Sequence, residues 1–228
     1  MAMDHDTGAL IHRLAESAEP VQPLPRPWVR TSVWVALAIA YLGLVIFVVS
    51  PRSDLMAKLS EWRYVIEQLA ALATGVAAAL AAFASVIPGY SRKFILAPAL
   101  PLAVWLATLG QGCVQDWISS GPHGLTLRPD WLCFPSIALV GALPAVAMLA
   151  MLRRGAPLTP RLTIALGALA AAGLGNFGLR FFHPQDAGLM VLVWQFGSVF
   201  ALSALAGWAG RYMLPWRAIL DSERHFSR

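Results

Sequence analysis

The sequence predicts an all-α integral membrane protein with six transmembrane helices and both termini in the cytoplasm. One observation is composition: only 13% of the 228 residues are charged and 58% are hydrophobic, whereas a soluble domain carries about 25% charged residues. The other is length, because several apolar stretches reach the roughly 20 residues that a helix needs to cross a bilayer. These stretches are Ser32–Ser50, Tyr64–Ile87, Phe94–Cys113, Phe134–Leu152, Thr159–Leu179 and Gly188–Ala209.

The first element, residues 1–18, is predicted to be a short amphipathic helix on the cytoplasmic side. Leu10, Ile11 and Leu14 share one face at helical spacing, and most other positions are polar. One interpretation is that this face docks into a groove of a soluble partner. The alternative is a frayed tail, or a helix that rests on the lipid surface.

Residues 19–30, EPVQPLPRPWVR, hold four prolines and are expected to form a semi-rigid extended linker. The membrane domain then occupies residues 31–215, and residues 216–228 form a basic cytoplasmic tail. The segment before the first span is polar and has no apolar core. We therefore expect no cleavable signal, and the first span stays in the membrane as an anchor.

Among the spans, the second and fifth are rich in Ala and Gly. Small residues let helix backbones approach closely, so these two spans are expected in the interior of the bundle. The pairs Ala171-xxx-Gly175 and Ser203-xxx-Gly207 fit this packing pattern, although composition bias explains either pair equally well. Prolines inside spans predict local kinks. They are Pro98, Pro101 and Pro144.

The orientation follows from the distribution of Lys and Arg, which are enriched in cytoplasmic loops. Twelve lie on the side of the termini: Arg13, Arg26, Arg30, Arg92, Lys93, Arg153, Arg154, Arg161, Arg211, Arg217, Arg224 and Arg228. Five lie on the other side: Arg52, Lys58, Arg63, Arg128 and Arg180. Tryptophans near span ends are expected to be interfacial anchors. They are Trp34, Trp62, Trp117, Trp131, Trp208 and Trp216. Since the positive charges sit in short loops rather than on one soluble face, the net charge of +5 does not indicate a nucleic-acid partner.

Polar residues of the spans gather toward the outer side. They are Glu67, Gln68, Gln111, Cys113, Asp116, Asp130, Cys133, Asn176, Arg180, His183 and Asp186. A small transporter or channel is one alternative, but it needs polar groups near the midplane, and the sequence places almost none there. Another is a membrane enzyme with an outer-face site, built from Asp116, Asp130, His183 or Asp186. The chain has no HExxH, no GxSxG and no glycine-rich phosphate loop.

The only two cysteines, Cys113 and Cys133, are both expected near the outer surface, in an oxidising compartment. They can form a disulfide if their Cα atoms come within about 7 Å. Alternatively Cys133 and His183, with Cys113 or Asp186, form a site for a soft or heavy metal ion. The third interpretation is that both cysteines are small core or lipid-interface residues.

Short features along nearly the whole chain resemble a known family. The features are TGALIHRLA at Thr7–Ala15, SPRSDL at Ser50–Leu55, a cysteine opening span four, RRGAP at Arg153–Pro157, FHPQD at Phe182–Asp186, and Trp194. In this order they resemble the six-span membrane anti-sigma factors of the NrsF type, which regulate extracytoplasmic-function (ECF) sigma factors negatively.

The resemblance implies a non-enzymatic protein of the bacterial inner membrane, acting in transcription regulation during stress. Its N-terminal segment would hold an ECF sigma factor, with Leu10, Ile11 and Leu14 as anchors, until a redox or metal signal outside releases it. The family's sensor is a pair of cysteines. Cys133 matches the first, but His183 stands at the second position. Either Cys113 is the partner, or Cys133 and His183 bind a metal, or this chain has lost the sensor. The resemblance does not specify the oligomeric state.

Overall fold

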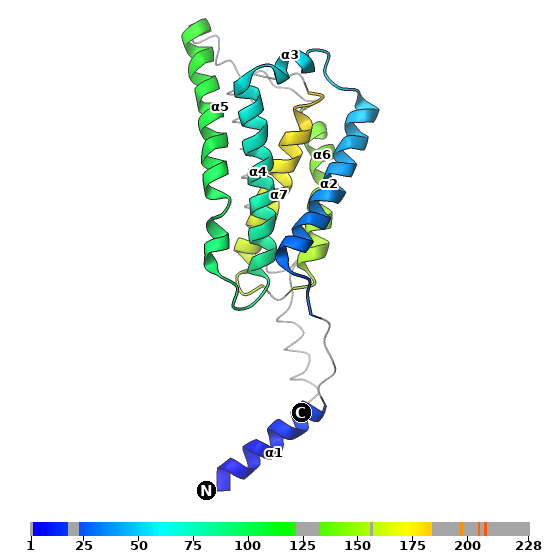
Figure 1. The fold of residues 1–228 in the computed structure, drawn as a ribbon, viewed down its shortest axis with the longest axis vertical. Helices are drawn as coiled ribbons and strands as arrows, with labels where there is room; N and C mark the ends of the chain where they lie inside the picture. The colour runs from blue at the N-terminus through cyan, green and yellow to red at the C-terminus, as the bar shows by residue number, and fades with distance from the viewer. Residues whose placement is uncertain are drawn as a thin grey trace.

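The computed structural model describes residues 2–17, 23–121, 133–155 and 157–183, with the single positions Gly197, Leu205 and Trp208. Within these residues every regular element is a helix, as predicted. Helix α1, Ala2–Glu16, stands apart from a bundle of helices (Figure 1). The bundle contains α2 (Pro27–Val49), α3 (Leu55–Leu59), α4 (Trp62–Ser85), the 3₁₀ helix η1 (Arg92–Leu96), α5 (Ala99–Ser120), α6 (Cys133–Leu152) and α7 (Pro160–Leu179).

Four helical segments of the described chain are long and apolar enough to cross a membrane, namely Pro27–Val49, Trp62–Ser85, Lys93–Ser119 and Pro160–Leu179. Part of α6, Leu139–Leu152, is a shorter apolar helix. The predicted sixth span, Gly188–Ala209, lies outside the described residues apart from three isolated positions.

The helices run alternately, so the bundle has two distinct ends. At the end that we name the basic end, α2, α5 and α7 begin and α4 and α6 finish (Figure 1). All predicted cytoplasmic Lys and Arg residues of the described bundle and its flanking loops lie there: Arg26, Arg30, Arg92, Lys93, Arg153, Arg154 and Arg161. The opposite end, which carries α3 and His183, is named the polar end. The chain topology therefore separates the two groups of charges as the sequence predicts.

Helices α4 and α7 form the centre, as their Ala and Gly content predicts. A Cβ on Gly173 would lie 2.8 Å from both the Ala71 carbonyl oxygen and the Gly75 nitrogen, so the two backbones touch there. The predicted Ala171-xxx-Gly175 pair is not this contact, because Gly175 faces Val140 and Gly141 of α6. The rotation of α7 about its axis, which sequence spacing does not specify, decides which glycine meets α4.

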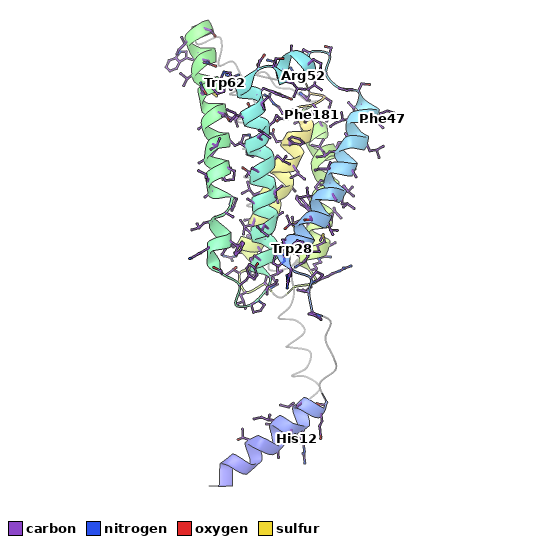
Figure 2. All side chains as sticks on the ribbon, viewed as in Figure 1. His12, Trp28, Phe47, Arg52, Trp62 and Phe181 are labelled. Carbon is purple, nitrogen blue, oxygen red and sulfur yellow. The ribbon has the colours of Figure 1, made fainter. Side chains whose placement is uncertain are left out.

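The surface of the bundle carries many exposed large apolar side chains, which is compatible with a membrane protein. Figure 2 shows Trp28 at the basic end and Phe47 and Trp62 toward the polar end, and all three side chains are exposed. Trp117 and Trp208 are exposed too, as expected of interfacial anchors. The prediction that Trp34 is an interfacial anchor is wrong, because its side chain is fully buried. Its indole N–H donates to the Pro144 carbonyl oxygen at 2.9 Å.

Prolines account for further differences from the predicted spans. Helix α2 starts at Pro27 rather than Ser32, because proline suits the first helical turn, where its missing N–H is not needed. The proposed linker is therefore shorter than residues 19–30. Similarly, Pro98 is the N-cap of α5 and Pro101 lies in its first turn, so neither interrupts a helix interior. Of these three prolines, Pro144 alone lies in the interior of its helix, α6, as predicted.

Candidate functional site

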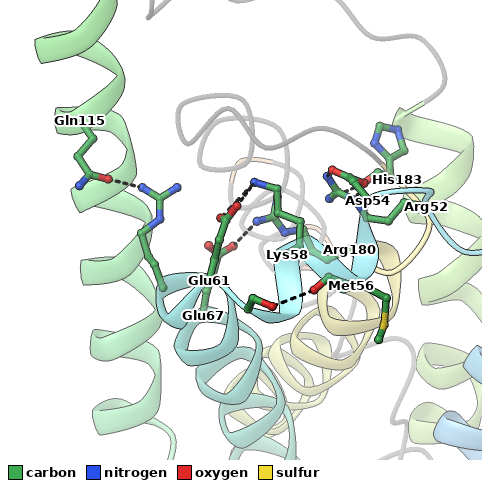
Figure 3. Close-up of polar contacts among 11 residues, drawn as sticks. Arg52, Asp54, Met56, Lys58, Glu61, Glu67, Gln115, Arg180 and His183 are labelled. Carbon is green, nitrogen blue, oxygen red and sulfur yellow. Dashed lines mark hydrogen bonds and ion pairs between the residues drawn. The ribbon is translucent and has the colours of Figure 1, made fainter.

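A cluster of buried polar side chains lies at the polar end of the bundle (Figure 3). We name it the polar cluster; its members are Arg52, Tyr64, Glu67, Gln68, Asn176 and Arg180. Arg52 comes from the loop after α2, the next three residues from the first two turns of α4, and the last two from the end of α7. Because α4 begins where α7 ends, antiparallel packing brings these side chains together.

The cluster satisfies the carbonyl groups at the end of α7. The last carbonyls of any helix have no partner within that helix. Here Gln68 donates through Nε2 to the Phe177 oxygen and the Tyr64 hydroxyl to the Arg180 oxygen, both at 3.0 Å. The backbone N–H of Arg52 donates to the Phe181 oxygen at 3.0 Å. The end of α7 is thus tied to α4 and to the loop that follows α2.

A buried ion pair lies within the same cluster. The Arg180 guanidinium is 3.4 Å from the Glu67 carboxylate, and both side chains are almost fully buried. The guanidinium also lies over the ring of Tyr64, 5.4 Å from its centroid. A positive charge at a helix C-terminus is favourable, and removing one partner of a buried pair usually costs several kcal/mol. The pair therefore holds α4 and α7 in one register.

Arg52 joins this cluster to the segment that contains His183. Its guanidinium donates to both carboxylate oxygens of Asp54, at 2.6 and 2.8 Å, and to the His183 carbonyl at 3.5 Å. The hydrogen bonds from Arg52 lower the pKa of Asp54 from 3.8 to about 2. A carboxylate with a lowered pKa stabilises the fold at higher pH, and that contribution is lost as the pH falls toward about 2. The contact is consequently insensitive to pH near neutrality.

Asn176 differs from its neighbours because its amide is only 6% exposed and neither its oxygen nor its nitrogen has a hydrogen-bond partner among the described residues. The Oε1 atom of Gln68 is in the same situation. A buried polar group without a partner costs about 1–3 kcal/mol. Such a group is usually retained for a purpose other than stability.

We expect the substitution Asn176→Leu to stabilise the protein by about 1 kcal/mol, because leucine has a similar size and no polar group to desolvate. The measurement is thermal unfolding of the detergent-solubilised protein. Gln68→Leu is the matched control, and it should destabilise because it removes the bond to the Phe177 oxygen. A lower unfolding temperature for Asn176→Leu would mean that the amide has a stabilising partner after all.

The predicted sensing residues are only partly described. His183 follows α7, is half-buried, and has its backbone held by Arg52. Cys113 is half-buried on α5. Cys133 begins α6, but its side chain lies outside the described part, as does Asp186. No group of three His, Cys, Asp or Glu side chains among the described residues is arranged to hold a metal ion. The metal site and the disulfide therefore stay predictions.

The sequence did not predict the partners within the polar cluster. Arg52 was counted as a charge that orients the chain, and Arg180 also as a polar residue of the outer side, but the sequence analysis gave neither a partner, although each is buried and paired. One signal was present: Glu67 lies near the outer end of span two and Arg180 directly follows the outer end of span five, and an acidic residue in an apolar span usually has a basic partner.

Comparison with known proteins agrees with these features. The family model described as "NrsF: Negative regulator of sigma F" matches residues 14–216. No curated protein matches this chain, and no solved structure does.

Proposed function

From the premise that this chain belongs to the NrsF family, negative regulators of sigma F, we propose that it is a membrane-embedded anti-sigma factor. It holds an ECF sigma factor at the bacterial inner membrane and thereby keeps the sigma factor from RNA polymerase. A family of regulators points to a non-enzymatic role. The single observation that carries the proposal is the family match over most of the chain.

The surface proposed for binding the sigma factor is the apolar face of α1. Leu10, Ile11 and Leu14 are 57%, 62% and 61% exposed, and α1 lies away from the bundle (Figure 1). On the opposite face, His12 lies 3.4 Å from Glu16, one turn further along. An isolated helix of 15 residues is only marginally stable in water. Docking its apolar face into a groove of the partner would stabilise it.

The membrane arrangement proposed is the six-span bundle with both termini in the cytoplasm. The four long apolar segments and the apolar part of α6 support it. The concentration of Lys and Arg at the basic end supports the orientation, because positive residues are enriched on the cytoplasmic side. The polar end then faces outward, and α1 projects into the cytoplasm.

The signal is proposed to be oxidative or metallic and to act near Cys133 and His183, with Cys113 or Asp186 as further candidates. A thiolate and an imidazole would suit a soft metal ion. A displacement of His183 would change its contact with Arg52, because the Arg52 guanidinium donates to the His183 carbonyl oxygen. Arg52 lies just after the end of α2. Helix α2 is continuous from there to Pro27, where the segment carrying α1 is attached. Shifting the protein from mostly binding to mostly releasing needs roughly 5 kcal/mol of differential affinity.

The proposal is tested by purifying the tagged protein from its host and identifying what co-purifies, beside a variant that lacks residues 2–22. The deletion stops at residue 22 because Arg26 is the N-cap of α2 and Arg30, in the first turn of α2, packs on the ring of Phe83 in α4. We expect a sigma factor with the full chain and none with the variant. Equal thermal unfolding of both proteins serves as the control for an intact bundle.

A sigma factor that remains bound to the shortened protein would move the binding site elsewhere on the cytoplasmic side. The absence of any sigma factor from both samples, with stable protein in unstressed cells, would overturn the regulatory function. In that case an outer-face ligand site or a transport role would be the next hypothesis.

A further inference from the structure

The basic end of the bundle has a marked imbalance of charge. Its basic residues are Arg26, Arg30, Arg92, Lys93, Arg153, Arg154 and Arg161. The segments that carry them, within residues 23–53, 68–115 and 133–183, contain no Asp or Glu. The helix dipoles add to the imbalance, since three described helices begin at this end and two finish there. A helix N-terminus carries a partial positive charge and a C-terminus a partial negative one. The described part of this end therefore carries basic side chains but no Asp or Glu side chain.

Two of those arginines lie next to each other. The guanidinium of Arg30 donates through Nη2 to the Met151 carbonyl oxygen. The backbone N–H of Arg154 donates to that same oxygen at 3.4 Å. Both side chains are positively charged and both residues bind the same carbonyl oxygen, so the two charges repel each other. The loop that carries Arg154 is also held close to α4, because a Cβ on Gly155 would lie 2.5 Å from the Cβ of Val86.

Arg30 is buried in spite of this repulsion. Its side chain stacks on the ring of Phe83, 4.5 Å from the centroid, and the residue is 5% exposed. Its Nη1 atom has no hydrogen-bond partner within the described chain. A buried charge is normally paired, because desolvation is costly. A buried, unpaired donor beside a second arginine is the arrangement that binds an anion, and arginine matches the geometry of a phosphate group.

We propose that Arg30 and Arg154 bind the phosphate group of an anionic phospholipid at the basic end of the bundle. The phosphate group is expected to come from a lipid, because the cytoplasmic leaflet contains anionic headgroups. These headgroups attract arginine-rich ends of membrane helices. The exposed indole of Trp28, two residues before Arg30, suits the same headgroup level. This inference rests on the proposed membrane placement but not on the sigma factor, so the two can fail separately.

The test measures thermal unfolding of the full chain in a neutral detergent while phosphatidylglycerol, phosphatidylcholine or inorganic phosphate is added. Phosphatidylglycerol should raise the unfolding temperature of the wild type at a lower concentration than phosphatidylcholine or inorganic phosphate does. For Arg154→Gln we expect the phosphatidylglycerol concentration that gives half of the full stabilisation to rise about tenfold. A tenfold change corresponds to the loss of one hydrogen bond to a charged group. Arg161→Gln is the matched control, because it removes the same charge from an exposed position at the same end.

A second readout separates binding from a structural role. Without added lipid, Arg154→Gln should be at least as stable as the wild type, since it removes the repulsion with Arg30. With phosphatidylglycerol present, the wild type should be more stable than Arg154→Gln. Equal effects of phosphatidylglycerol and phosphatidylcholine, or equal losses in both variants, would overturn the site. An equal response to inorganic phosphate would overturn the lipid as its occupant.

Discussion

Replacing Leu10, Ile11 and Leu14 together by alanine is expected to weaken sigma-factor binding by about a thousandfold or more. Each of these side chains is more than half exposed in the structure, and burying one aliphatic side chain in an interface contributes about 1.5–3 kcal/mol. Three such losses exceed the roughly 4 kcal/mol that corresponds to a thousandfold change. Alanine keeps the helix propensity of the segment, so the variant tests the anchors rather than the helix.

The measurement is the dissociation constant between the purified full chain and the sigma factor identified by co-purification. The double variant His12→Ala/Glu16→Ala is the matched control, because these residues form an exposed pair on the other face of α1. An exposed pair of this kind contributes at most about 1 kcal/mol. If the control weakens binding as much as the triple variant does, the apolar face is not the binding surface.

The substitution Gly173→Val is expected to destabilise the bundle by about 3 kcal/mol or more. The new side chain would meet the backbones of Ala71 and Gly75, which lie 2.8–2.9 Å from the Cβ position. A backbone in the middle of a helix cannot move aside as a flexible side chain can, so α4 and α7 must separate. Overpacking a core costs typically 1–3 kcal/mol, and separation of the two central helices adds lost contacts elsewhere.

Gly43→Val is the control for this experiment, because Gly43 lies on an exposed face of α2 and a Cβ there meets nothing within 4 Å. Thermal unfolding and size-exclusion chromatography in detergent measure the effect. Comparable stability of the two variants would show that α4 and α7 do not touch at Gly173. Since the ion pair of Glu67 and Arg180 joins the same two helices, Gly173→Val should also disturb the polar cluster.

The helical class, the approximate positions of the described spans and the separation of charges between two ends follow from the amino-acid sequence alone. These features depend on composition along the chain: an apolar run of sufficient length, such as Thr159–Leu179, favours a buried or membrane-spanning helix wherever it is placed. The central position of α4 and α7 belongs to the same group, because small residues favour close packing whatever the exact rotation. The family resemblance was likewise present in short local motifs, and the family match confirmed it.

The partners of individual side chains were decided by the tertiary structure. Trp34 reads as an interfacial anchor by its position in the chain, yet it binds the Pro144 carbonyl inside the core. Arg30 reads as a loop charge, yet it lies over Phe83 beside Met151. Hydropathy and charge are properties of one segment at a time, whereas a contact depends on how two helices rotate and slide against each other. A rotation of α7 by one residue, about 100°, would leave its hydropathy unchanged and turn Gly173 away from α4.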